Sequence, residues 1–186
     1  MQINDPDYKR KSFIQTGNIV FWTATINGWR HLLKEDRYKQ IIIDSLRNLS
    51  ERELIDVFAF VIMPNHIHLI WRINKMNGKE TPQGSFLKYT AHQFKKLLLD
   101  NPDSLIKFAV NAPNKQYEFW QRDSLAIDLY SRNVMLQKLH YLHMNPLAPH
   151  WQLANDPADY FWSSANFYER RIMEFDFLKD IWEVFG

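Results

Sequence analysis

The stretch Asp56-Val-Phe-Ala-Phe-Val-Ile62, Met-Pro-Asn, His66-Ile-His-Leu-Ile-Trp-Arg-Ile73 decides the fold. Both outer runs are apolar and rich in β-branched and aromatic residues, as β-strands are. Between them stand Met63, Pro64 and Asn65, where proline fixes φ and asparagine tolerates turn geometry. The pattern predicts a tight antiparallel hairpin.

The segments around this hairpin alternate between strand and helix. Residues Asn18 to Ile26 are β-branched and aromatic and predict a strand, whereas Arg30 to Leu49 and Thr81 to Asn101 have apolar residues at helical spacing. The order strand, helix, strand, strand, helix, strand is that of a ferredoxin-like split βαβ fold. We therefore predict an α+β fold in which an antiparallel sheet has helices on one face.

The rest of the chain adds to this pattern. A further helix is predicted from about Ser131 to Asn145, because Pro146 disfavours the helical conformation of the residue before it. Leu105 to Trp120 places the turn-rich NAPNK between two short apolar runs. Residues 147–186 form an aromatic-rich extension that we expect to pack across the core. At 186 residues, 1–186 is expected to be a single domain.

Composition excludes several kinds of chemistry. The chain has no cysteine, so disulfides, thiolate zinc sites and cysteine nucleophiles are excluded. It has neither the apolar run of a signal peptide nor an apolar stretch of about 18 residues that could span a membrane, which predicts a cytoplasmic protein with no membrane partner. The formal net charge of +2 permits a nucleic-acid partner without requiring one.

Two histidines stand in the second strand of the hairpin. Strand alternation places His66 and His68 on one face, with Ile67 and Leu69 on the other. Their Cβ atoms should lie roughly 7 Å apart, close enough for both rings to bind one divalent ion. The alternative is that both histidines merely occupy the solvent side of a half-buried strand.

A tyrosine stands on the helix predicted near residue 131. Lys138, Tyr141 and Asn145 share one stripe of this helix by i, i+3 and i+4 spacing. A phenol is a poor nucleophile in water, but a metal bound to the phosphate and a nearby cation such as Lys138 make its attack feasible. The amide oxygen of Asn145 could supply a third metal ligand. The alternative is an ordinary tyrosine at the edge of the core and an asparagine that stops the helix.

Basic residues suggest where DNA could bind. Lys88, Lys95 and Lys96 fall near one face of the second predicted helix, and Lys9-Arg10-Lys11 forms another cluster. Each cluster could contact phosphates, as could Lys138 beside the tyrosine. The alternative is a solvated helix face.

Three motifs together resemble the single-tyrosine HUH transposases, and most closely the REP-associated tyrosine transposases. They are VIMPNHIHLIWR at 61–72, LHYLHMNPL at 139–147 and Trp-Ser-Ser at 162–164, in the order that the family has. The resemblance extends from about Ile14 to Tyr168. It implies a ferredoxin-like catalytic domain, usually dimeric, that binds hairpin-forming single-stranded DNA and uses no nucleotide cofactor.

The resemblance also implies roles for individual residues. His66 and His68 would hold Mg²⁺ or Mn²⁺, Tyr141 would attack the scissile phosphate, and a 5′-phosphotyrosine with a free 3′-hydroxyl would result. Asn145 stands where related enzymes place a polar metal ligand. The implied function is a single-strand DNA endonuclease and strand-transferase, associated with DNA in the cell. Two alternatives remain: a domesticated protein that binds hairpin or repeat DNA without transposition, and a hydrolase that uses only the histidines.

Overall fold

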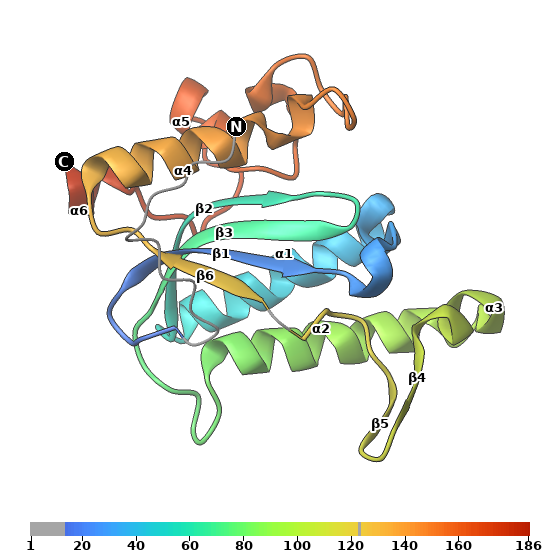
Figure 1. The fold of residues 1–186 in the computed structure, drawn as a ribbon. Coiled ribbons are helices and arrows are strands. Elements are labelled where there is room, and N and C mark those ends of the chain that lie inside the picture. Colours follow the sequence, from blue (N-terminus) through green and yellow to red (C-terminus); the bar gives the residue numbers. More distant parts are fainter. Residues whose placement is uncertain (1–13, 123) are drawn as a thin grey trace, which may run out of the picture.

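The computed structural model describes residues 14–122 and 124–186 (Figure 1). Its centre is a four-stranded antiparallel sheet with the order β2-β3-β1-β6. The strands are β1 (Ile19–Thr25), β2 (Ile55–Ile62), β3 (His66–Ile73) and β6 (Leu125–Asp128). This is the strand order of a split βαβ sheet, and the predicted α+β class and hairpin are confirmed.

Helices cover both faces of the sheet (Figure 1). The helices α1 (Asp36–Glu51) and α2 (Pro82–Leu98) pack together on one face, as the ferredoxin-like pattern predicts. The added helix α4 (Arg132–Met144) lies on the opposite face, where it contacts β2 and β3. The helix predicted from Arg30 begins later, at Asp36, because a short 3-10 turn over Leu32–Lys34 precedes it.

The remaining elements are short. They are η1 (Asn27–Trp29), α3 (Pro102–Leu105), η3 (Ile106–Phe108), β4 (Ala109–Ala112), β5 (Lys115–Tyr117), η4 (Asn145–Leu147), η5 (Pro157–Asp159), α5 (Ala165–Arg170) and α6 (Trp182–Phe185). The NAPNK stretch forms the β4–β5 hairpin, which extends away from the sheet (Figure 1). The fourth strand of the sheet is β6, which the sequence patterns did not single out.

Aromatic packing fills the layer between the sheet and the helices α1 and α2. Trp22 of β1 stacks on Trp71 of β3 with ring centroids 5.0 Å apart, and Phe86 of α2 meets Trp22 edge-on at 5.8 Å. All three side chains are fully buried. Burial of large rings in such contacts is the main apolar stabilisation of this layer.

The C-terminal extension packs along the outer edge of β2. Trp162 O accepts from Ile62 N at 2.9 Å, and Ser164 N donates to Phe60 O at 2.9 Å, so this segment pairs with β2 as a short antiparallel strand would. Farther along β2, Lys179 N donates to Val57 O at 2.9 Å. The tail thus runs along the edge of β2, and its side chains Trp162, Phe175 and Ile181 belong to the buried hydrophobic cluster.

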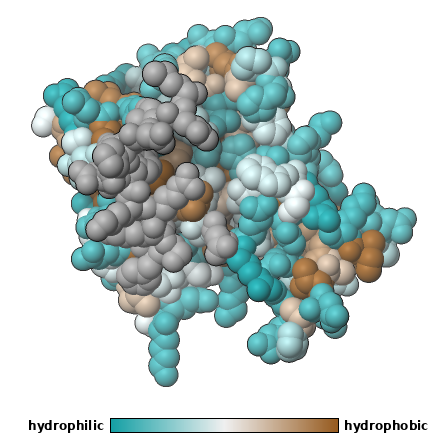
Figure 2. All heavy atoms as spheres, viewed as in Figure 1, coloured by the Kyte–Doolittle hydropathy of each residue, from teal (hydrophilic) through white to brown (hydrophobic). Residues whose placement is uncertain are grey.

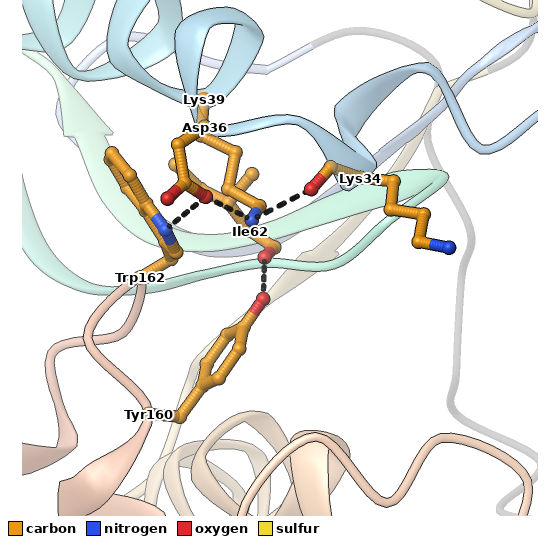
Figure 3. A network of polar contacts seen from close by, with 6 residues as sticks. All are labelled: Lys34, Asp36, Lys39, Ile62, Tyr160 and Trp162. Carbon is orange, nitrogen blue, oxygen red and sulfur yellow. Dashed lines mark hydrogen bonds and ion pairs between the residues drawn. The ribbon is translucent and has the colours of Figure 1, made fainter.

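A network of hydrogen bonds connects the segment that contains Tyr160 and Trp162 to α1 and β2 (Figure 3). The carboxylate of Asp36 accepts from Trp162 Nε1 at 2.9 Å and from Lys39 Nζ at 2.8 Å, and the hydroxyl of Tyr160 donates to Ile62 O at 2.8 Å. The hydrogen bond from Lys39 is the main cause that lowers the pKa of Asp36. Trp162 of the Trp-Ser-Ser motif therefore joins the tail to the start of α1.

The surface is mostly hydrophilic on the face that Figure 2 shows, and hydrophobic residues gather toward the end of α2 and α3. Leu99 and Ile106 in that region are more than half exposed. None of the described helices combines the length and apolar character needed to cross a membrane.

Candidate active site

The two predicted histidines lie side by side on an inner strand of the sheet. β3 follows a turn in which Met63 N donates to His66 O at 2.8 Å, and this turn sets the alternation of the strand. His66 and His68 share one face, with ring centroids 4.7 Å apart. The prediction that the two rings point the same way is confirmed, although both are buried rather than solvated.

Each imidazole is held by a polar neighbour at Nδ1. His66 Nδ1 lies 2.7 Å from Asn65 Oδ1, and His68 Nδ1 lies 2.7 Å from Thr23 Oγ1 on the paired strand β1. Because Asn65 Nδ2 donates to Trp29 O, its Oδ1 faces His66 as an acceptor, and the ring donates from Nδ1. This tautomer leaves a lone pair on His66 Nε2.

Burial keeps both histidines neutral. Desolvation lowers the pKa of His66 to about 4, with a further contribution from His150, and lowers the pKa of His68 well below its ordinary value. His68 Nε2 is buried and has no hydrogen-bond partner among the described residues. A neutral imidazole with an unsatisfied buried nitrogen has the chemical form of a metal ligand.

Helix α4 places the predicted tyrosine over these histidines. The helix is capped by Ser131, whose hydroxyl accepts from Val134 N at 3.3 Å, and its buried side consists of Met135, Leu139, Leu142 and His143. Tyr141 lies on the other side and is half exposed. Its ring centroid is 5.4 Å from that of His68. Two segments far apart in sequence therefore meet at one point.

Lys138 adds positive charge next to the phenol. Its Nζ lies 5.9 Å from the ring centroid of Tyr141 and 5.3 Å from that of Phe21 on β1. Burial lowers the pKa of Lys138. A cation held over aromatic faces in partly buried surroundings interacts more strongly with a nearby anion than it would in water.

A cavity of about 870 Å³ opens between β3 and α4. Four of the predicted site residues line it, namely His66, His68, Tyr141 and Asn145. Asn145 follows the last residue of α4, so its side chain reaches the same space. The structure thus brings together the residues for which the sequence predicted metal binding and nucleophilic attack.

The predicted DNA-binding lysines of α2 lie elsewhere. Because α2 covers the opposite face of the sheet from α4, Lys88, Lys95 and Lys96 are not near the cavity (Figure 1). Lys88 and Lys95 line a separate groove of about 680 Å³ between α2 and the β4–β5 hairpin. The cluster Lys9-Arg10-Lys11 lies outside the described residues.

Sequence reasoning missed several residues of the site. Asn65 and Thr23 hold the histidines, and His140, His150 and Trp151 line the cavity. Asn65 stood inside the motif that contains His66, so its position next to the ring was a usable signal. Thr23 had none, because its contact depends on the register in which β1 pairs with β3.

The donor set fits a divalent ion bound by few protein ligands. Over residues 14–122 and 124–186, no three side chains drawn from His, Asp and Glu are placed to hold a metal. The cavity instead offers two neutral imidazoles and the amide of Asn145. Such a set leaves coordination positions for a phosphate or water, as catalytic metal sites require.

The sheet therefore presents the paired histidines of β3 to the tyrosine of the added helix α4. Among solved structures, the chain is similar to a REP-associated tyrosine transposase bound to a REP hairpin, with a TM-score of 0.59. The identity is 17%, and the match covers 91% of this chain and 90% of the other. No family model matches the chain, and no curated protein sequence matches it. The likeness shows a shared fold.

Proposed function

We propose that this protein is a metal-dependent single-stranded DNA endonuclease and strand-transferase, a transposase that acts through a covalent tyrosine intermediate. The observation behind the proposal is that Tyr141 faces His68 across one cavity, with ring centroids 5.4 Å apart. A nucleophile beside a cavity with two neutral metal-type ligands suits attack on a phosphodiester.

In the proposed cleavage step, Tyr141 Oη forms a bond to the phosphorus of the DNA. The bond from phosphorus to the 3′ oxygen of the preceding nucleotide breaks, and the phenol proton ends on that oxygen. The products are a 5′-phosphotyrosine and a free 3′-hydroxyl. Attack by another 3′-hydroxyl reverses the step and joins two strands, because the covalent link retains the energy of the phosphodiester.

His66 and His68, through Nε2, and Asn145, through its amide oxygen, would hold Mg²⁺ or Mn²⁺. When bound, such an ion polarises a phosphoryl oxygen and stabilises the charge that develops during attack. Asn65 and Thr23 keep the rings oriented. Lys138 stabilises the phenolate of Tyr141 and the phosphate as proton transfer proceeds.

The proposed substrate is a DNA hairpin with single-stranded flanks. The solved relative in fold is bound to a hairpin, and the chain has a second basic region on α2 that could contact the phosphates of a stem. In this proposal Lys88, Lys95 and Lys96 contribute affinity rather than cleavage. The resemblance further leads us to propose that residues 1–186 act as one catalytic domain and as a homodimer.

The test is a search for a covalent adduct. Purified protein, Mg²⁺ or Mn²⁺ and labelled single-stranded oligonucleotides, carrying candidate hairpins from beside the gene, are mixed and resolved on a denaturing gel. We expect a protein–DNA adduct that Tyr141→Phe and His66→Ala abolish. Tyr89→Phe is the matched control, because Tyr89 is similarly exposed but lies on α2.

Two other outcomes separate the alternatives. Hairpin binding without an adduct, across metals and substrates, would identify a domesticated DNA-binding protein. Cleavage that persists in Tyr141→Phe without an adduct would identify a hydrolase that uses the histidines alone.

A further inference from the structure

The rim of the histidine cavity is aromatic. Trp29 and Trp151 line it together with the apolar side chains of Met144 and Ala148. The volume of about 870 Å³ lies within the range of pockets that hold small organic ligands, about 300–1,000 Å³. The cavity therefore has room for a nucleobase as well as for a phosphate group and an ion.

Trp29 is held in an exposed position by its backbone. The side chain is 61% exposed, which is unusual for a tryptophan that packing alone would place. Its φ of 57° lies in the left-handed region that bulky residues rarely adopt, and it follows Gly28 with a φ of 66°. The turn is fixed at its start by Asn27, whose backbone N–H donates to Phe119 O at 2.7 Å.

The amide of Asn65 connects this turn to the histidines. Asn65 Nδ2 donates to Trp29 O at 3.2 Å, while Asn65 Oδ1 accepts from His66 Nδ1 at 2.7 Å. The amide is buried, and its contact with His66 is shielded from water. The backbone of Trp29 is thus held by the same residue that orients a proposed metal ligand.

We propose that Trp29 is a stacking platform for an unpaired base of the nucleotide beside the phosphate that Tyr141 attacks, with Trp151 forming the adjoining wall. The proposal rests on the proposed function. Because the backbone of Trp29 is held by hydrogen bonds before binding, stacking a base on it costs less conformational entropy than ordering a free loop would. Stacking there would hold whichever base lies beside the attacked phosphate, because every base presents an aromatic face whatever its sequence.

The test measures binding without cleavage. The full chain is titrated in EDTA with fluorescein-labelled oligonucleotides that carry one of the candidate hairpins and a single-stranded flank, along which an abasic site is moved one nucleotide at a time. We expect wild-type affinity to fall when the abasic site removes the stacked base. Trp29→Ala should bind the intact strand roughly tenfold more weakly and be indifferent to that same abasic site.

Two variants check the interpretation. Trp29→Phe should retain most of the affinity, because a smaller aromatic ring still stacks. Tyr89→Ala removes an exposed ring from α2, on the other face of the sheet, and should bind as the wild type does. Unchanged binding by Trp29→Ala, an abasic penalty that persists in it, or a wild-type chain that does not bind single strands would each overturn the proposal.

The binding result for Trp29 and the adduct result for Tyr141 can fail independently of each other. A Tyr141-dependent adduct combined with no effect of Trp29→Ala would remove the stacking site and leave the transposase chemistry. A Trp29-dependent loss of binding without any adduct would leave the stacking site and remove the chemistry.

Discussion

The phenol ring of Tyr141 meets the imidazole of His68 edge-on, with their centroids 5.4 Å apart and their planes at 62°. One ring comes from an inner strand of the sheet and the other from a helix added to the split βαβ core. The sheet fixes the histidine on both sides, whereas Tyr141 remains half exposed. The imidazole is therefore held rigidly, whereas the phenol proposed as the nucleophile is open to a large ligand.

Replacing Asn65 by alanine should weaken metal binding. The variant loses the acceptor that orients His66, and the loss of such a supporting hydrogen bond typically lowers metal affinity by roughly 10–100-fold. Electron paramagnetic resonance of free Mn²⁺ during titration gives the affinity independently of activity. Asn166→Ala is the control, because Asn166 is also buried but lies on α5. Equal affinities for Asn65→Ala and the wild type would remove Asn65 from this role.

Replacing Lys138 by methionine should slow formation of the covalent adduct. Methionine retains much of the apolar stem but removes the charge beside Tyr141, for which we expect a loss on the order of 100-fold in rate. Lys138→Arg should recover part of the rate, because it keeps the charge. Rates are measured at saturating DNA, so that weaker binding is not mistaken for slower attack; an unchanged rate in Lys138→Met would contradict the assignment.

Replacing Ser164 by alanine should destabilise the fold. The hydroxyl accepts from Phe60 N at 3.0 Å and lies 2.9 Å from His143 Nε2, and all three groups are buried. Leaving buried polar groups unpaired costs about 1–3 kcal/mol. Urea denaturation measures the loss. Ser50→Ala is the control, because Ser50 Oγ is buried without a hydrogen-bond partner among the described residues, so its removal should have little effect.

Acid should destabilise the protein through Asp56. Burial alone would raise the pKa of Asp56, but hydrogen bonds from Lys179 and Arg72 hold it below its ordinary value. Its carboxylate therefore stabilises the folded state above pH about 3.9, and this contribution is lost as pH falls from there through the lower pKa of the folded state.

Asp56→Asn tests this linkage. The variant should be about 1–3 kcal/mol less stable at neutral pH, because it weakens the charge-assisted contacts with Arg72 and Lys179. The difference from the wild type should shrink as the pH falls below 3.9. Urea denaturation at a series of pH values gives both results, and a difference that stays constant into acid would contradict the assignment.

Local patterns were sufficient to predict three strands of the sheet and the side of its element on which each proposed site residue lies. The apolar runs around Pro64 predicted the β2–β3 hairpin, and alternation along β3 placed His66 and His68 on one face. Helical spacing likewise placed Tyr141 on the side of α4 that is not packed in the core. Each of these features depends on neighbours within a few residues, which a sequence displays directly.

Features that depend on distant pairing were not predicted. β6 has four residues, of which only Ala126 is buried, so it lacks the apolar run that identifies a strand. Thr23 supports His68 only through the β1–β3 register. Helical spacing predicted a basic face on α2, of which Lys88 and Lys95 line one groove. That spacing does not say which face of the sheet the helix covers.

The pairing of the tail with the edge of β2 has a consequence for the chain during its synthesis. β2 leaves the ribosome well before the segment around Trp162 that pairs with its edge, so its N–H and C=O groups stay available to other chains during that interval. Nascent or truncated chains that end before this segment should therefore aggregate through strand pairing, whereas the finished protein presents a closed edge there.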